Sequence, residues 1–437
     1  MTASTLTPNA RVFPLHGPTT SPVSPHVVVP ALRMPEAAAA MVFAAVRQRG
    51  PVARDVIATQ TGLSIATVNR QVSALLDARL LRERPDLAAT GAIGRPRIQV
   101  EINHEPYLTI GLHIGARTTS IVASDLRGRI LDAVETPTPS GTLAAAMASL
   151  AESALRYQSR WRRRRALWAG VAIGGVVDSA GGTVDHPRLG WTQAPVGPVV
   201  AAALGLPVSV ASHVDAMAGA ELLLGRRVPA KPERGAAHRG NILYVYARET
   251  VGFAQVIDGR VHVPAGGPGT VAGLPAYSEL LGGSGTLEST VSDEAVVAAA
   301  RAAGILAGSG PKSTVAELLR LARTADAASA AAARELLDER ARVLGGAVAL
   351  LRDMLNPDDL VVGGQAFTEY PGGMAALRAA YVQRSLLGAR DLRVTAFGNH
   401  VQEAGAGVVS LSSIYADPLS AVQRARHRSA AVGSGRK

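Results

Sequence analysis

Six residues between positions 64 and 73 have side chains that could read the edges of DNA bases: Ser64, Ala66, Thr67, Asn69, Arg70 and Ser73. These side chains are small or can form hydrogen bonds, and one of them is an arginine. Such a set suits entry into a DNA major groove, which is about 12 Å wide, if a single helix presents it. The elements around the set therefore decide its interpretation.

The surrounding sequence predicts a helix-turn-helix over residues 52–81. Apolar residues recur at helical spacing on two faces, Ala53, Val56, Ile57 and Ala58 on the first and Val68, Val72, Leu75 and Leu76 on the second. Gly62 lies between them and can take the positive φ of a tight turn, and Ser64 is a suitable N-cap. We interpret the pair as a DNA-binding module; the alternative is a helical hairpin that only packs.

Two strand-like segments come next and predict a wing. Residues 80–82 begin the first strand, and residues 98–102 alternate apolar and polar as a second strand should. The polar stretch between them ends in Gly94, Arg95, Pro96 and Arg97, which predicts a basic tip for phosphates or a narrow minor groove. A solvated hairpin whose arginines have no role is the alternative.

Composition limits the class of protein. The chain has 437 residues, of which 47% are hydrophobic, enough for more than one domain with a large core. The absence of cysteine excludes disulfides and thiolate metal sites, and the net charge of +11 favours a polyanionic partner. Because no apolar run approaches a membrane span and no secretion signal begins the chain, we expect a cytoplasmic protein without a membrane partner.

Pattern changes along the chain predict its division. We expect a flexible proline-rich arm over residues 1–33, a winged helix-turn-helix domain over 34–105, a first lobe over 106–228 and an interlobe loop over 229–240. A second lobe with return helices is expected over 241–415 and a basic, frayed tail over 416–437. The arginine-rich run at 160–165 could clamp phosphates, but we interpret it as the exposed side of a helix end.

Residues 107–411 alternate strands with Ala/Leu-rich helices. One strand group covers 108–114, 121–125 and 129–133, and a second covers 242–246, 252–257 and 260–263. Two similar β-rich starts, each followed by helices, predict a duplicated α/β fold with a cleft between two lobes.

Together with the winged module, this region resembles the ROK family of repressors, open reading frames and sugar kinases. The resemblance rests on short motifs in family order: Gly94-Arg95-Pro96, residues 111–115, 170–174, 177–178, 187–191, 282–288, 355–357 and 361–364. It implies an α/β fold in which a winged helix-turn-helix precedes a two-lobed, actin-like domain. It also implies a sequence-specific transcriptional repressor whose body descends from a sugar-binding kinase.

The catalytic positions depart from the family pattern. Family kinases begin with Asp-x-Gly-Gly-Thr, where this chain has His113 in place of the acid and Ala116 in place of a glycine. The family's Asn-Asp pair, which supplies the catalytic base, corresponds to Ser212 and His213. Histidine can act as a general base, but without the phosphate-loop acid we predict no enzyme activity. A sugar kinase with an accessory DNA-binding module is the alternative.

The zinc motif of the family is also altered. Alignment on its glycines places Glu279, Leu281 and Thr286 at the cysteine positions and Gly273 near the histidine position. One carboxylate with these neighbours cannot form a tetrahedral site. We therefore predict neither zinc nor any other cofactor.

The family's sugar contacts correspond to Arg188, Ser212, His213 and Thr270. A site that selects a sugar needs buried acceptors for its hydroxyls, since an unpaired polar group costs about 1–3 kcal/mol. Two carboxylates are lost here, while Arg188 and His213 would make the cleft more cationic. An anionic effector and an empty, purely structural cleft are both consistent with these changes.

The expected partner is double-stranded DNA. Helix-turn-helix proteins gain affinity by placing two modules on adjacent half-sites, so we expect a homodimer or homotetramer. The identity of any small-molecule effector cannot be taken from the sequence. A regulator controlled by a protein partner, without a small ligand, is a further alternative.

Overall fold

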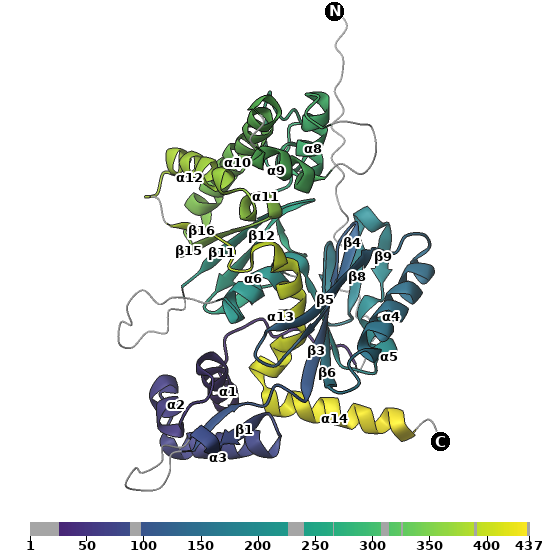
Figure 1. Cartoon of the computed structure of the whole chain (residues 1–437), viewed down its shortest axis with the longest axis vertical. Coiled ribbons are helices and arrows are strands. Elements are labelled where there is room, and N and C mark those ends of the chain that lie inside the picture. The colour runs from purple at the N-terminus through teal and green to yellow at the C-terminus, as the bar shows by residue number, and fades with distance from the viewer. Residues whose placement is uncertain are drawn as a thin grey trace, which may run out of the picture.

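The computed structural model describes residues 26–87, 98–225, 240–264, 266–306, 314–324, 327–388 and 391–434. They form a winged module that lies below a two-lobed α/β body (Figure 1). The tip of the wing, with Arg95, Pro96 and Arg97, lies outside the described residues, as do residues 229–239 of the interlobe loop expected over 229–240.

The winged module consists of α1 (Ala38–Arg49), α2 (Arg54–Thr61), α3 (Ile65–Asp77), β1 (Leu81–Arg84) and β2 (Gln99–Ile102). Gly62 ends α2 with a φ of 72°, and Ser64 caps α3 by accepting a hydrogen bond from the Thr67 amide. These are the turn and cap that the sequence predicts. The apolar face of α2 is narrower than predicted, however, because Ile57 is buried while Val56 is exposed.

Lobe 1 is built on a five-stranded sheet in the order β10-β6-β3-β4-β5. Its elements are β3 (Tyr107–Ile114), β4 (Thr118–Ser124), β5 (Ile130–Pro137), α4 (Leu143–Ser159), β6 (Arg165–Ile173), β7 (Val176–Asp178), β8 (Thr183–His186), β9 (Trp191–Ala194), α5 (Val196–Leu204) and β10 (Val208–Ser212). Helices α4 and α5 cover one face of the sheet, where their apolar residues share a core with its strands. The arginine-rich run at 160–165 follows α4 as a turn and leads into β6.

Lobe 2 is built on a sheet in the order β13-β12-β11-β15-β16, with β14 paired to β12. Its strands are β11 (Ile242–Ala247), β12 (Val251–Ile257), β13 (Arg260–His262), β14 (Gly269–Thr270), β15 (Asp359–Gly363) and β16 (Leu392–Val394). Its helices are α7 (Leu287–Val291), α8 (Asp293–Ala302), α9 (Val315–Arg323), α10 (Ala327–Leu355), α11 (Gln365–Thr368) and α12 (Pro371–Arg384).

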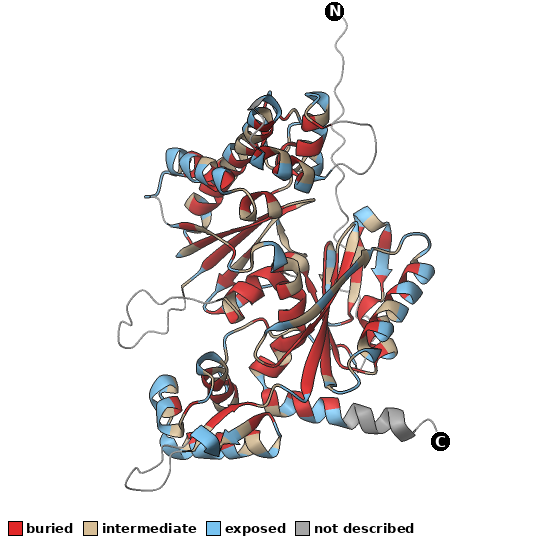
Figure 2. Cartoon of the chain, viewed as in Figure 1, coloured by how far each residue is buried: buried red, intermediate tan, exposed pale blue. Residues whose placement is uncertain are grey.

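Two helices join the lobes. Helix α6 (His213–Leu223) packs on the lobe 2 sheet, α13 (Val401–Ala416) packs on the lobe 1 sheet, and the two helices pack on each other. A Cβ atom at Gly111 would lie 2.6 Å from the Ala406 carbonyl carbon, and one at Gly170 would lie 2.2 Å from the Ser410 nitrogen. The two glycines therefore allow α13 to contact the sheet. Figure 2 shows the resulting buried layer through both sheets and these helices.

The structure corrects both expected ends of the chain. Residues 26–33 belong to the folded body, because Val27 pairs with Val208 and Arg33 pairs with Arg260. The segment after residue 416 forms α14 (Pro418–Ser434), which buries Ala421, Val422 and Ala425 where it packs against lobe 1 and the winged module. The high proportion of proline at one end and of arginine at the other suggested unfolded segments, but a few apolar residues in each make long-range contacts.

Candidate DNA-binding surface and interlobe cleft

The outward face of α3 carries the residues predicted to read DNA. Ala66, Asn69, Arg70 and Ser73 are exposed, whereas Val68, Val72 and Leu75 on the opposite face are fully buried. The hydroxyls of Ser64 and Thr67 lie 3.0 Å apart and belong to the helix cap, so part of their hydrogen-bonding capacity is used within the protein. Ile65, exposed at the first position of α3, was not among the predicted residues.

Arg70 differs from the arginines of the wing. Among the described residues it forms no ion pair, whereas Arg82 and Arg84 are both held by Glu101. Arg127, from the turn after β4, donates a third hydrogen bond to the same carboxylate at 3.1 Å. Burial opposes the ionisation of Glu101, but the hydrogen bonds from Arg82 and Arg84 outweigh it and lower its pKa. The arginines of the wing strands are therefore not free cations. Glu101 also joins the wing to the body, because it binds Arg127.

The four predicted cleft residues do not form one site. Arg188, in the turn before β9, donates a hydrogen bond to the Glu249 carbonyl oxygen at 2.6 Å and forms an ion pair with Glu294 of α8. Arg117 of lobe 1 binds the other oxygen of Glu294 at 3.0 Å. Arg188 is therefore not a free cation: it shares the Glu294 carboxylate with Arg117, and this carboxylate links the two lobes.

Ser212 and Thr270 also have internal partners. Ser212 caps α6 and donates a hydrogen bond to Asp215 at 2.6 Å, and burial raises the pKa of Asp215 to about 6. The Thr270 hydroxyl donates to the Val251 carbonyl oxygen at 3.2 Å and accepts from the Ala272 amide. Both side chains thus stabilise local structure in their own lobe.

His213 remains beside the position of the missing acid. Its ring stacks on His113 with centroids 6.1 Å apart and meets the edge of Tyr246 at 5.6 Å. Burial lowers the pKa of His213 to about 4, and burial and the charges of His213 and Arg248 lower that of His113. Two neutral imidazoles therefore replace the acids that phosphoryl transfer would need at these positions.

A cavity lies between the lobes, where the sequence predicts a cleft, but the residues that line it differ from the predicted ones. It has a volume of about 440 Å³ and is lined by residues from both lobes. Its charged residues are Arg117, Glu135, Arg248, Glu249, Asp293, Glu294 and Arg301. Because arginines and carboxylates both line it, the cavity is polar rather than simply cationic. These charged residues come from distant segments of the chain, so the sequence pattern does not indicate which of them line the cavity.

The residues at the former zinc positions have structural contacts. Leu281 is buried among apolar side chains of lobe 2, Thr286 caps α7, and Glu279 is exposed. Within the described ranges, no group of three His, Cys, Asp or Glu side chains is placed to hold a metal ion. None of the described helices is long and apolar enough to cross a membrane.

Comparisons with known proteins agree with this architecture. The ROK family model matches residues 109–411. A transcriptional regulator of Mycobacterium tuberculosis is 66% identical over 406 residues, which cover 91% of this chain and 90% of that protein.

Two solved structures share the fold. A ROK family transcriptional regulator, described as a homologue of the E. coli MLC protein, matches with a TM-score of 0.65 and 21% identity, covering 89% of this chain and 97% of that one. A ROK family glucokinase from Streptomyces griseus, in complex with glucose and AMPPNP, matches with a TM-score of 0.57 and 23% identity. The match covers 69% of this chain and 99% of the kinase. About a third of this chain, a length that would include the winged module, therefore has no counterpart in the kinase.

Proposed function

The chain belongs to the ROK family, and we propose that it is a sequence-specific DNA-binding transcriptional regulator without kinase activity. The observation that carries the proposal is the exposed face of α3, on which Arg70 has no ion-pair partner among the described residues while the opposite face is fully buried. A free guanidinium beside Asn69 and small side chains is suited to base edges in a major groove.

In this proposal α3 reads the bases and the wing tip adds backbone contacts. Strands β1 and β2 of the wing pair with each other, but their arginines Arg82 and Arg84 are held in ion pairs by Glu101, Glu105 and Asp86. The tip is therefore expected to supply the wing's contribution to affinity through phosphates or a narrow minor groove. Such contacts make binding fall as the salt concentration rises.

We further propose that the body does not phosphorylate sugars. The positions of the two family acids hold His113 and His213, whose pKa values are lowered by burial. The nearest acid on α6, Asp215, is hydrogen-bonded by Ser212. A general base needs a pKa near the working pH, which neither histidine has; Asp215, whose pKa burial raises to about 6, is itself buried and already accepts the Ser212 hydroxyl.

The regulator is proposed to work in the cytoplasm as a homodimer or homotetramer. Two winged modules on adjacent half-sites would give the affinity that one short helix cannot. An effector, if one is used, would bind in the polar cavity between the lobes; control by a protein partner without a small ligand is the alternative. Light scattering at micromolar concentration tests the assembly, and a monomer that protects one half-site would contradict it.

The test of DNA binding is a footprint of the purified protein on the DNA upstream of its own gene. Arg70→Ala should weaken specific binding by about 1–3 kcal/mol, or roughly 5- to 150-fold, while leaving non-specific binding nearly unchanged. Arg156→Ala is the matched control, since Arg156 is an exposed arginine on α4 of lobe 1. Footprints that are unaffected by deletion of residues 35–100 would refute the assignment.

A further inference from the structure

Residues 26–34, here called the strap, lie along the outer edges of both sheets before the chain enters the winged module. At the first edge, the Val28 amide donates to the Val208 carbonyl oxygen at 2.8 Å, and the Val208 amide donates to the His26 carbonyl oxygen at 2.9 Å. At the second edge, the Met34 amide donates to the Gly259 carbonyl oxygen at 2.8 Å, and the Val261 amide donates to the Leu32 carbonyl oxygen at 2.9 Å. Strands β10 and β13 end their sheets, so the strap extends one sheet in each lobe.

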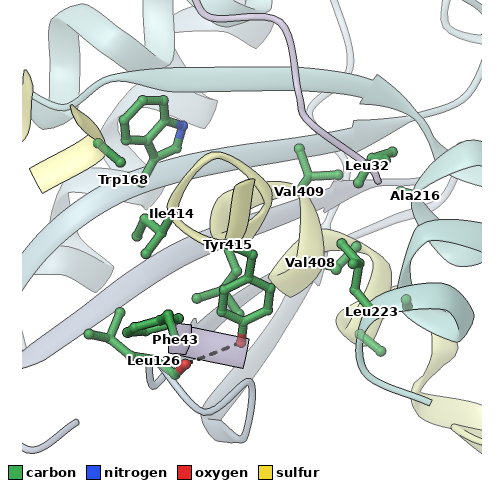
Figure 3. Close-up of a cluster of buried hydrophobic side chains, with 14 of the residues drawn as sticks. Leu32, Phe43, Leu126, Trp168, Ala216, Leu223, Val408, Val409, Ile414 and Tyr415 are labelled. Carbon is green, nitrogen blue, oxygen red and sulfur yellow. Dashed lines mark hydrogen bonds between the residues drawn. The ribbon is translucent and has the colours of Figure 1, made fainter. Parts of the chain in front are cut away.

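The body has room for the strap at three glycines. A Cβ atom at Gly182 would lie 3.0 Å from Val27, one at Gly219 would lie 2.8 Å from Leu32, and one at Gly259 would lie 3.1 Å from Met34. These glycines belong to lobe 1, the central helix α6 and lobe 2, respectively. Figure 3 shows Leu32 beside Val409 of α13 and Ala216 of α6. The strap therefore packs closely against both lobes and the helix between them.

The middle of the strap is also attached. The Ala31 amide donates a hydrogen bond to the Ser412 hydroxyl on α13 at 3.2 Å, and the Leu32 side chain is 4% exposed. Only residues 28–32 join the two paired segments, and such a peptide spans at most roughly 14 Å. A rotation that separates β10 from β13 beyond this length must detach one end of the strap.

The strap leads almost directly into the winged module. Pro35, Glu36 and Ala37 separate it from α1, and proline limits the flexibility of this link. Glu36 forms ion pairs with Arg33 at 2.9 Å and with Arg260 of β13 at 3.6 Å. The position of α1 is therefore coupled to the edge of lobe 2.

We propose that the strap couples the arrangement of the two lobes to the position of the DNA-binding module. While it is attached to both sheet edges, the lobes and α1 hold one arrangement. A change in the angle between the lobes detaches it from β10 or β13 and frees the module to move. This inference rests on the proposed DNA-binding function for its biological consequence, but its structural part can be measured without DNA.

The experiment releases the strap by Gly219→Leu and restores it with a disulfide. Leucine at 219 should displace Leu32 while favouring the helical conformation of α6 more than glycine does. Arg33 and Arg260 form a non-hydrogen-bonded antiparallel pair, whose Cα atoms lie about 4.5 Å apart, within the range of a disulfide. Because the chain contains no cysteine, Arg33→Cys with Arg260→Cys creates a single unambiguous crosslink.

Two measurements are made on each full-length variant. The first is hydrogen exchange at the Val28 and Met34 amides and along α1, and the second is affinity for a duplex from the DNA upstream of its own gene. Gly219→Leu should speed exchange at both strap amides and in α1, and weaken DNA binding at least tenfold. The oxidised disulfide should restore affinity in the Gly219→Leu background and leave the otherwise unchanged protein like wild type.

Gly273→Val is the matched control, since a Cβ atom there meets nothing within 4 Å, and it should change neither measurement. The proposal would be overturned if the strap amides of Gly219→Leu exchange their hydrogens rapidly while exchange in α1 and affinity for DNA stay at wild-type values. It would also be overturned by wild-type strap amides that exchange as fast as those of an unfolded peptide. If Gly219→Leu does not fold, Val28→Pro removes the donor to Val208 instead.

The two proposals fail in different ways. A wild-type protein that binds no duplex, but whose α1 exchange rises when the strap is released, would contradict DNA binding and retain the coupling. A protein that binds DNA equally well with the strap attached or released would retain DNA binding and contradict the coupling.

Discussion

The guanidinium of Arg47 lies over the ring of Tyr415, 4.4 Å from its centroid, and joins the first helix of the winged module to the last turn of α13. Arg47 also donates a hydrogen bond to the Leu223 carbonyl oxygen at 2.8 Å, at the end of α6. Figure 3 shows Phe43 of α1 and Leu126 together on one side of Tyr415, whose hydroxyl donates to the Leu126 carbonyl oxygen. The two central helices thus meet the DNA-binding module at one arginine.

We expect Arg47→Ala to loosen this junction. It removes a cation–π contact and a hydrogen bond, which together should lower the free energy of unfolding by about 1–3 kcal/mol. Denaturant unfolding followed by tryptophan fluorescence measures the change. Arg49→Ala, at an exposed position on the same helix, is the control and should stay within about 0.5 kcal/mol of wild type. Equal effects of the two substitutions would show that the junction contributes nothing.

We expect stability to fall as the pH drops through the range in which the cleft histidines resist protonation. Burial lowers the pKa of His213 from 6.5 to about 4, so between these values the unfolded chain binds a proton that the folded protein does not. The free energy of unfolding therefore decreases as the pH falls from about 6.5 to 4. Burial raises the pKa of Asp215 to about 6, which acts in the opposite direction and reduces the net slope.

The measurement is therefore a comparison of variants. His213→Asn should lose less stability than wild type between pH 6.5 and 4 in denaturant titrations at each pH. His400→Asn changes a histidine that is largely exposed and should retain the wild-type slope. Parallel curves for wild type and His213→Asn would show that His213 is not held neutral by the fold.

The helix-turn-helix could be predicted because its signals are local. Gly62 and Ser64 act on residues within one turn of themselves, through a positive φ and a helix cap. The strap gave no comparable signal, since Val27 pairs with a strand more than a hundred residues away and its proline-rich surroundings suggested a flexible arm. A β-bridge at the edge of a sheet leaves no periodic pattern in so short a segment.

The cleft was predicted less well for the same reason. The resemblance gave Arg188 as a cleft residue, but its ion-pair partner Glu294 is 106 residues away in sequence. The charge around Arg188 depends on this ion pair, and nothing in the sequence near either residue indicates that the two side chains meet. The strand groups over 108–133 and 242–263 could be predicted because each strand carries its own apolar pattern, whereas the strands that complete the two sheets come from distant segments.

We expect the purified protein to lack hexokinase activity and stoichiometric zinc. His113 and His213 stand where two acids would be required, and the former zinc loop contains Leu281 buried among apolar side chains. Coupled assays with ATP and hexoses test the first point, with His213→Asn as the background, and elemental analysis tests the second. ATP-dependent phosphorylation above that background, or one tightly bound zinc per chain, would contradict the prediction.

The final prediction concerns the ligand of the interlobe cavity. Arg117 and Glu294 line the cavity, and Glu294 also pairs with Arg188, so an anionic ligand beside Arg117 must compete with this carboxylate for the two guanidinium groups. Glu294→Gln should therefore increase the thermal stabilisation that an anionic probe such as pyrophosphate gives. The substitution by itself should lower the free energy of unfolding only slightly, because the ion pairs are partly exposed and such pairs contribute about 0–1 kcal/mol.

Arg188→Ala should reduce the stabilisation that pyrophosphate gives, and Arg156→Ala should leave it unchanged. Stabilisation by neutral glucose that persists in Arg188→Ala and His213→Ala would instead favour a retained sugar site, and no response to any probe would favour a regulator without a small ligand.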